Sequence, residues 1–274
     1  MKLLIVGLGS MGKRRARLAK GIDPSIQIAG VDTNESRRAE ACGLGLTDAA
    51  YPSIGEAAAA FAPDAALVCT APLSHAAAIG ELLDHSLPVF TELNLVDDGY
   101  DRNLAKAAEK GVPLFLSSTM LYRREIQYIK DQVRQFGKPV HYIYHIGQYL
   151  PDWHPWENYK NFFVGNARTG GVREILGIDL PWLLDTFGPV EDLTVQVDSI
   201  SDLGLPYPDC ATLLLRHASG AQGVLAADVV SPKAVRNFEC FGDGLHLFWE
   251  GNPKALYRFA DGDKQYVDTY GDFT

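Results

Sequence analysis

The stretch Val6-Gly7-Leu8-Gly9-Ser10-Met11-Gly12 decides the fold expected for the first half of the chain. It has the pattern Gly-x-Gly-x-x-Gly, it ends the apolar run Lys2–Val6, and it opens a segment with helical spacing. In such a loop the first glycine permits a tight turn, the second lets a pyrophosphate approach the backbone, and the third lets helix and strand pack closely. The free N–H groups of the helix N-terminus then attract phosphate.

An acidic residue lies where this kind of loop needs one. Asp32 follows the apolar run Ile26–Val31, about 20 residues beyond Gly12. A carboxylate there binds the hydroxyl groups of an adenosine ribose and repels a 2′-phosphate, so the sequence predicts dinucleotide binding with NAD preferred over NADP. Two alternatives stay open: Asp32 could cap the following helix, and the neighbouring Arg37 and Arg38 could receive the phosphate of NADP.

Strand-like and helix-like segments alternate through residues 1–118. Strands are expected at Lys2–Val6, Ile26–Val31, Ala65–Thr70, Pro88–Leu93 and Pro113–Ser117, and helices at Ser10–Ala19, Glu35–Ala41, Ile54–Phe61, His75–Leu83 and Asp98–Lys110. Strands separated by helices of this length form βαβ units with right-handed crossovers. We therefore expect an α/β domain over residues 1–118, with the doubly wound parallel sheet of a Rossmann fold.

Loops at the carboxyl ends of the strands are expected to line the ligand site of this domain. Candidate cofactor-binding residues are Gly7, Gly9, Ser10, Met11, Gly12, Asp32, Thr70, Ala71, Pro72, His75 and Glu92. His75 could also be an ordinary surface residue in the first turn of a helix. The basic run Lys13-Arg14-Arg15-Ala16-Arg17 is expected to be the solvated face of the first helix.

The pattern changes at residue 119, after which strands outnumber helices. Helices are expected at Arg124–Phe136 and Gly171–Phe187, an aromatic loop at Tyr149–Arg168, and strands at Val140–Gln148, Asp192–Val197, Ala211–Arg216, Gln222–Val229, Asn237–Phe241, Leu245–Trp249 and Ala255–Phe259. This indicates an α+β domain over residues 119–274, with a large, mostly antiparallel sheet, for substrate binding and oligomerisation. Tyr266–Thr274 is either the end of the chain or an edge strand.

Composition and charge exclude several classes of protein. Hydrophobic residues make up 47% and charged residues 22% of the 274 residues, which is typical of a globular protein. The net charge of −9 does not suit a nucleic-acid partner, which needs a basic face. No apolar run approaches the roughly 20 residues of a membrane-spanning helix, and Met1–Val6 is too short for a signal peptide, so a cytoplasmic protein is expected. The four cysteines show neither metal-ligand spacing nor a disulfide pattern.

The order of these pieces resembles the Gfo/Idh/MocA family, named for glucose–fructose oxidoreductase, inositol dehydrogenase and a rhizopine-catabolism protein. The shared features are the glycine loop, a Thr-x-Pro-x-x-His segment matched by Thr70, Pro72 and His75, and a second-domain helix opened by Gly170-Gly171. The resemblance spans essentially the whole chain. It implies an NAD(P)-dependent oxidoreductase that transfers hydride between the nicotinamide and a sugar, sugar derivative or nucleotide-sugar.

The resemblance also implies an assembly and a narrower branch. Relatives commonly cover the open face of the second-domain sheet with another subunit, so a homodimer or homotetramer is expected. The segments Gln148–Trp156 and Gly170–Trp182 are similar to a branch associated with unusual-sugar biosynthesis.

Two departures from the family pattern put the chemistry in question. Where the family has Glu-Lys-Pro, with a lysine that assists proton transfer, this chain has Glu92-Leu93-Asn94. The second-domain helix, which often carries an inward Asp and His in relatives, contains no histidine. The alternative function is therefore a catalytically silent dinucleotide-binding sensor or scaffold.

Oxidation of an alcohol needs a side chain that takes the hydroxyl proton. The candidate catalytic residues are His154, Tyr122, Glu174 and Asp179. Glu174 and Asp179 are five residues apart and so point in different directions on a helix.

Candidate substrate-binding residues come from the aromatic loop and from two other loops. They are Asn94, Arg123, Trp153, Trp156 and Tyr159. Aromatic faces stack on sugars, and Arg123 could anchor a carboxylate or phosphate. The loop could equally pack within the protein or into an oligomer contact, and Arg123 could pair with Glu125.

Overall fold

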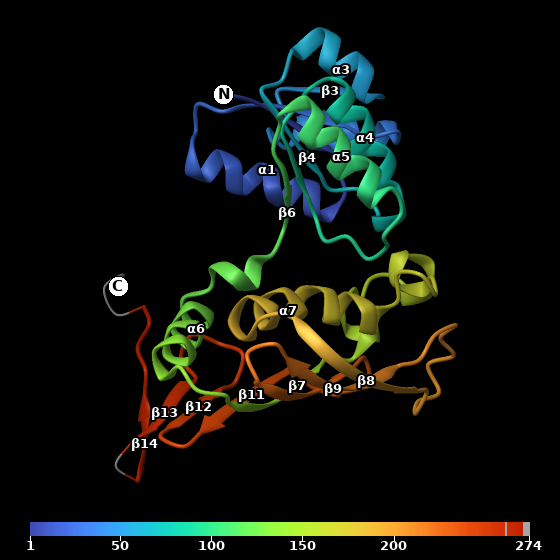
Figure 1. The fold of residues 1–274 in the computed structure, drawn as a ribbon. Coiled ribbons are helices and arrows are strands. Elements are labelled where there is room, and N and C mark those ends of the chain that lie inside the picture. The colour runs from blue at the N-terminus through green and yellow to red at the C-terminus, as the bar shows by residue number, and fades with distance from the viewer. Residues whose placement is uncertain (261, 271–274) are drawn as a thin grey trace. The chain divides into compact units, whose positions relative to one another are not determined.

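The computed structural model describes residues 1–260 and 262–270, and the chain divides into two units, residues 1–117 and 118–274 (Figure 1). In the first unit six parallel strands form one sheet in the order β3-β2-β1-β4-β5-β6. The strands are β1 (Lys2–Val6), β2 (Gln27–Val31), β3 (Ala49–Tyr51), β4 (Ala65–Val68), β5 (Val89–Thr91) and β6 (Leu114–Leu116). The helices are α1 (Ser10–Ile22), α2 (Glu35–Gly43), α3 (Ile54–Phe61), α4 (His75–Asp84) and α5 (Tyr100–Lys110), with the 3₁₀ turn η1 (Pro72–Ser74).

This strand order is that of a doubly wound Rossmann sheet, so the predicted α/β fold is confirmed. The sequence prediction missed β3, which pairs with β2 at the edge of the sheet. Its three residues, Ala-Ala-Tyr, are too few to show the alternation that predicts a strand.

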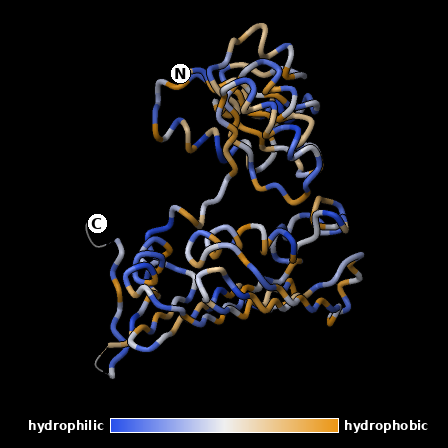
Figure 2. The backbone as a smooth tube through the Cα atoms, in the orientation of Figure 1, coloured by the Kyte–Doolittle hydropathy of each residue, from blue (hydrophilic) through white to orange (hydrophobic). Residues whose placement is uncertain are grey.

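Both faces of the parallel sheet are buried. Leu4 and Val6 face one hydrophobic cluster, while Leu3 and Ile5 face another on the opposite side. Helix α1 packs through the small residue Ala16 and leaves its larger apolar side chains exposed, because close packing onto β1 leaves no room for them. Figure 2 shows hydrophobic residues gathered along the strands of this unit.

The second unit is built on an eight-stranded sheet in the order β14-β13-β12-β11-β7-β10-β9-β8. The strands are β7 (His141–Gly147), β8 (Val190–Asp198), β9 (Cys210–His217), β10 (Gln222–Asp228), β11 (Val235–Gly242), β12 (Leu245–Trp249), β13 (Leu256–Ala260) and β14 (Asp263–Tyr266). Among these described strands the β7–β10 pair is parallel and the other pairs are antiparallel. The predicted large, mostly antiparallel sheet is confirmed.

Helices α6 (Arg124–Phe136) and α7 (Gly171–Phe187) cover one face of this sheet (Figure 1). The 3₁₀ turns are η2 (Thr119–Tyr122), η3 (Leu150–Asp152), η4 (Tyr159–Asn161) and η5 (Phe163–Gly165). Large aromatic side chains, among them Tyr142 and Trp182, fill the space between helices and sheet. The edge strand β14 spans Asp263–Tyr266 and shares only Tyr266 with the segment Tyr266–Thr274 suggested as an edge strand. Val267–Tyr270 are not in a strand, and residues 271–274 lie outside the described part.

Within residues 1–260 and 262–270, no helix has the length and apolar character that crossing a membrane requires.

Candidate functional site

The glycine loop between β1 and α1 can be formed only by glycines at two of its positions. Gly7 has a φ of +94°, and a Cβ on it would lie 2.8 Å from the Cys69 carbonyl carbon. A Cβ on Gly12 would lie 1.9 Å from the Gly7 carbonyl oxygen. By contrast, a Cβ on Gly9 would meet nothing within 4 Å, and no side chain caps the N-terminus of α1. The helix end therefore presents open backbone to an anion.

Asp32 joins the glycine loop to the end of β2. Its Oδ2 accepts a hydrogen bond from the Leu8 N–H at 2.9 Å, and its Oδ1 accepts one from the Asn34 N–H at 2.9 Å. The alternative that Asp32 caps α2 is wrong, because the N-cap is Asn34, whose side chain accepts a bond from the Arg37 N–H at 3.3 Å. The Asp32 carboxylate thus lies beside the loop that the sequence assigns to the dinucleotide.

The two arginines after β2 differ in what they bind. The Arg38 guanidinium donates to the Asp32 and Thr33 carbonyl oxygens at 2.6 and 3.1 Å. Arg37 is exposed and lies 3.7 Å from the Asp32 carboxylate. Both guanidinium groups are therefore engaged with the β2–α2 turn itself.

His75 is buried, so the alternative of an ordinary surface residue is wrong. Its Nε2 lies 2.9 Å from the Thr70 carbonyl oxygen, and its Nδ1 lies 2.7 Å from the Asn94 side-chain oxygen. His75 thereby links the loop after β4 to the loop after β5. It shapes the candidate cofactor loop that contains Thr70, Ala71 and Pro72.

The end of β5 carries an ion pair that the sequence prediction missed. Arg15 of α1 pairs with Glu92, donates to the Ser117 Oγ at 3.2 Å, and lies over the Phe90 ring at 5.2 Å. The expectation that the whole basic run is solvated is therefore wrong at Arg15. Burial raises the pKa of the neighbouring Cys69 thiol to about 12, and the charge of Glu92 adds to the rise. Glu92, a candidate cofactor contact, already has a cationic partner.

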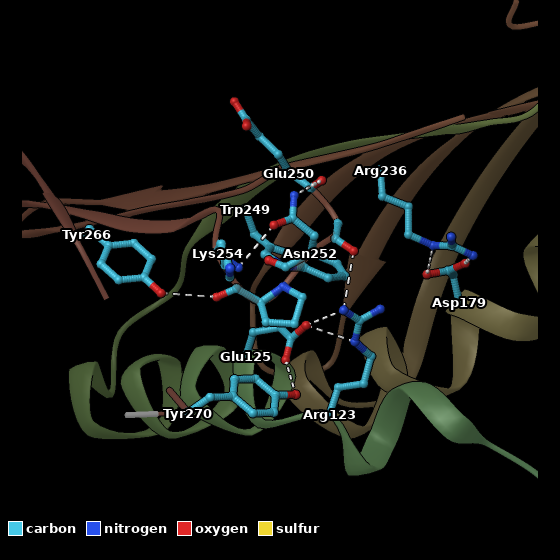
Figure 3. A network of polar contacts seen from close by, with 12 residues as sticks. Arg123, Glu125, Asp179, Arg236, Trp249, Glu250, Asn252, Lys254, Tyr266 and Tyr270 are labelled. Carbon is cyan, nitrogen blue, oxygen red and sulfur yellow. Dashed lines mark hydrogen bonds and ion pairs between the residues drawn. The ribbon is translucent and has the colours of Figure 1, made fainter. Parts of the chain in front are cut away.

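In the second unit, the buried Asp179 faces Arg236 (Figure 3) and has further polar partners. Its Oδ1 accepts hydrogen bonds from the Tyr144 hydroxyl at 2.6 Å and from the Trp182 Nε1 at 3.2 Å. Its Oδ2 pairs with the Arg236 guanidinium at 3.2 Å. Burial and the charge of Asp179 hold the pKa of Tyr144 well above its usual value. This candidate catalytic residue is fully occupied in holding α7 to the sheet.

Arg123 lies in a second network at the start of α6 (Figure 3). It pairs with the buried Glu125 and lies over the Trp249 ring at 5.3 Å. The Tyr270 hydroxyl donates to the other oxygen of Glu125 at 2.8 Å. The structure therefore shows the Glu125 pairing that the sequence left as an alternative to substrate binding.

The candidates in the aromatic loop differ in exposure. The His154 ring is stacked between Trp156 and Phe162, with centroid separations of 5.2 and 4.5 Å. Trp156 is 76% exposed, and the Tyr159 hydroxyl donates to the Leu203 carbonyl oxygen at 2.9 Å. Tyr122, outside this loop, is 67% exposed.

Two other candidates are Glu174, in the first turn of α7, and Trp153, whose Cη2 lies 3.4 Å from the position that a Cβ on Gly171 would occupy. The Glu174 Oε2 and the Trp153 Nε1 are both buried and have no hydrogen-bond partner in the described structure. Burial raises the pKa of Glu174 to about 7. Tyr207, which the sequence prediction missed because it lies in a loop without a motif, accepts a bond from the Gly171 N–H at 3.1 Å beside them.

The first unit is thus a dinucleotide-binding type of Rossmann domain, with an open helix N-terminus and a carboxylate at the end of β2. Residues 1–117 match the GFO_IDH_MocA family, described as an oxidoreductase family with an NAD-binding Rossmann fold. The match covers the first unit, which carries the glycine loop and Asp32. No curated protein matches the sequence.

Solved structures resemble the chain over nearly its whole length. An oxidoreductase from Agrobacterium radiobacter, solved in complex with NAD⁺, L-tartaric acid and magnesium, is 15% identical with a TM-score of 0.82, and the match covers 98% of this chain and 79% of that one. UDP-N-acetylglucosamine 3-dehydrogenase GnnA from Acidithiobacillus ferrooxidans is 19% identical with a TM-score of 0.78, covering 98% and 82%. The WlbA dehydrogenase from Bordetella pertussis, in complex with NADH and UDP-GlcNAcA, is 17% identical with a TM-score of 0.79, covering 97% and 77%. At these identities the likeness shows a shared fold.

Proposed function

We propose that this protein is an NAD-dependent dehydrogenase or reductase that acts on a CH–OH group of a sugar, sugar derivative or nucleotide-linked sugar. The observation that carries the proposal is the glycine loop tied to Asp32 through the Leu8 N–H bond of 2.9 Å. The sugar class is supported by structural relatives that include dehydrogenases of nucleotide-linked sugars.

The residues present fit a dinucleotide. The open backbone at Gly9 and the uncapped α1 would receive the pyrophosphate, because free N–H groups and the helix dipole favour anions. Asp32 would accept hydrogen bonds from the adenosine ribose hydroxyls with the lone pairs that Leu8 and Asn34 leave free. A bound NAD supplies a nicotinamide that accepts or donates hydride.

Preference for NAD over NADP follows from the charges after β2. A 2′-phosphate would lie near the Asp32 carboxylate, which repels it. Of the two neighbouring arginines, Arg38 is bound to two backbone carbonyl oxygens and Arg37 pairs with Asp32 itself at 3.7 Å.

The loops after β4 and β5 would position the cofactor through His75. Because His75 bonds both the Thr70 carbonyl and Asn94, it holds the two loops at a fixed separation. Asn94 stands in the segment where relatives carry Lys-Pro, so the substrate hydroxyl proton must be taken by a residue elsewhere in the chain.

A homo-oligomer formed through the open face of the second sheet is part of the proposal. Ile143 and Leu214 flank Val224 across three neighbouring strands and are 46% and 51% exposed. Eight strands about 4.8 Å apart and roughly 23 Å long present about 800 Å². That is close to the area of about 800 Å² per partner in a standard protein interface.

The test is a fluorescence titration with NADH and with NADPH, followed by addition of a panel of sugars and nucleotide-sugars to the same sample. We expect NADH to bind at least ten times more tightly than NADPH, and one sugar class to change the redox state of the cofactor. Asp32→Ala should reduce that preference, while Asp64→Ala, an exposed carboxylate elsewhere in the first unit, should not.

Absence of NADH binding would refute the proposal. Binding without turnover across the panel would instead favour the sensor or scaffold function, which the replacement of the family lysine by Leu93 motivates.

A further inference from the structure

We propose that a pocket within the first unit binds the hydroxymethyl end of a small alcohol. Helices α4 and α5 pack side by side (Figure 1), and the pocket lies between them and the strands β5 and β6. Every residue that lines it belongs to residues 1–117. The proposal therefore concerns this unit alone, and it stands whether or not the protein binds a dinucleotide.

The volume of the pocket limits what can enter it. The pocket measures about 50 Å³. A cavity of about 150 Å³ holds benzene, with its six non-hydrogen atoms, so roughly two such atoms fit inside this pocket. Tyr100 and Leu104 of α5 also line the pocket and are exposed, so it opens to solvent beside that helix. The carbon and oxygen of a hydroxymethyl group can lie inside, with the rest of the ligand over these two side chains.

One buried oxygen in the wall of the pocket lacks a partner. Asn103 lines the pocket and is buried, and its Nδ2 donates to the Ala76 carbonyl oxygen at 2.9 Å. Its Oδ1 is buried and has no hydrogen-bond partner among the described residues. A buried amide oxygen nearly always accepts a hydrogen bond from protein, water or ligand. A donor group that enters the pocket would supply this bond.

The polar side chains of the wall favour a ligand that donates a hydrogen bond. Thr91 lines the pocket, and its Oγ1 donates to the Glu92 carbonyl oxygen at 3.0 Å, so only its lone pairs remain for a ligand. The Asn103 oxygen can likewise only accept. Among the described residues that line the pocket, none is a lysine or an arginine, so the wall does not favour a carboxylate or a phosphate.

The remainder of the wall is largely apolar. It includes the side chains of Ile79, Leu104, Leu114 and Leu116. Apolar walls of this kind favour the methylene groups of a ligand. They disfavour a charged donor such as an ammonium group, which would lose its hydration on entry. A hydroxyl group supplies the donor without a charge, so an alcohol suits both the acceptors and the apolar side chains.

The pocket adjoins the candidate cofactor loops but is not formed by the residues expected to hold the pyrophosphate and ribose. His75, which contacts the Thr70 carbonyl oxygen and the Asn94 side chain, lines it, as does Asn94 itself. Gly9 and Asp32 do not line it. A competition experiment with NADH can therefore separate the two sites.

The experiment follows methyl spectra of the cofactor-free protein labelled with ¹³C at isoleucine. Ile79 lines the pocket and reports binding, whereas Ile28, buried in the cluster on the other face of the sheet, is the internal reference. The probes are 1-butanol and its isomer methyl propyl ether, which has no hydrogen-bond donor. We expect 1-butanol to shift the Ile79 signal with a Kd of about 1–10 mM. The ether should bind about tenfold more weakly or worse, because it cannot donate to Asn103.

Two neighbouring alanines of α4 provide matched variants. Ala76 lines the pocket, so Ala76→Leu fills it with a larger apolar side chain and should abolish the shift. Ala77 is exposed and does not line the pocket, so Ala77→Leu should bind 1-butanol as the unaltered protein does. Asn103→Leu removes the acceptor and should bind both isomers equally. The comparison of isomers uses the unaltered protein, so it decides the proposal even where a variant does not fold.

The other outcomes overturn the proposal. Equal binding of the two isomers by the unaltered protein would exclude the hydrogen bond, and a shift retained in Ala76→Leu would place the alcohol elsewhere. No shift with 1-butanol would leave water as the only occupant. Tighter binding of 1-butylamine, which could pair with Asp98 in the wall, would replace the hydroxyl group by an ammonium group.

Competition with NADH distinguishes this proposal from the proposed function. Loss of the 1-butanol shift on saturation with NADH would assign the pocket to the cofactor and overturn the proposal. A protein that binds 1-butanol in the pocket but binds no NADH would refute the proposed function and leave the pocket assignment intact.

Discussion

Replacing Arg236 by methionine is expected to destabilise the second unit by about 3 kcal/mol. Asp179 is fully buried, and its ion pair with Arg236 spans 3.2 Å. Methionine keeps the apolar stem of the arginine and removes the charge, so the buried carboxylate is left without a cation. Breaking a buried ion pair in this way costs about 3–5 kcal/mol, and the lower end applies because Arg236 is 31% exposed.

A double variant separates the cost of the unpaired buried charge from the cost of the lost hydrogen bonds. Asp179→Leu together with Arg236→Met removes both charges, which replaces the ion pair by apolar groups and recovers part of the loss. Recovery is incomplete, because the Tyr144 hydroxyl and the Trp182 N–H then lose their acceptor, at about 1–3 kcal/mol for each group left unsatisfied. The double variant is therefore expected to be less stable to unfolding than the unaltered protein.

The assay is scanning calorimetry at neutral pH, with urea unfolding followed by tryptophan fluorescence. A loss of about 3 kcal/mol should lower the Tm of the second unit by roughly 6–12 °C. Arg134→Met is the matched control, since Arg134 is an exposed arginine on α6, and it should shift stability by less than about 0.5 kcal/mol. An Arg236→Met variant as stable as the control would refute the account of this network.

Three further predictions concern the glycine loop, the open sheet face and the buried acid. Gly12→Ala should abolish NADH binding in a fluorescence titration, because its Cβ would lie 1.9 Å from the Gly7 oxygen; retained affinity would contradict the loop geometry. Light scattering should give a mass of two or four chains, and Ile143→Glu should shift it toward one, whereas a single-chain mass for the unaltered protein would exclude the assembly. The free energy of unfolding should fall by about 3 kcal/mol as pH rises from 4.5 through 7. The reason is that burial raises the pKa of Glu174 to about 7, so in this range the folded protein keeps a proton on Glu174 that the unfolded chain has lost. In urea unfolding at a series of pH values, Glu174→Gln should flatten this part of the profile.

The elements that the sequence predicted best are those with strong local signals. Helices Ile54–Phe61, Arg124–Phe136 and Gly171–Phe187 begin and end where the pattern placed them. The last of these continues through Pro181, because the packed aromatic core on its inner face outweighs one lost hydrogen bond. Strand β3 was missed because its residues carry no alternation.

Among the site residues too, those with strong local signals were predicted and those with distant partners were not. The glycine loop and Asp32 were predicted because each is fixed by local backbone geometry and by a short spacing in the chain. Arg15, by contrast, looked like one member of a solvated basic run. Its partner Glu92 is 77 positions away, and only the βαβ crossovers bring α1 beside the end of β5.

The sequence by itself determined the Rossmann class, the glycine loop and the two-part organisation of elements, because periodicity and turn chemistry act between residues close together in the chain. Only the tertiary structure decided which charged candidates are free to act. Glu174 and Asp179 are both acids on one helix, yet one lies unpaired beneath an aromatic loop and the other is neutralised by Arg236. That difference arises from contacts between segments far apart in the chain, and burial and partner charges, which set reactivity, exist only once those contacts form.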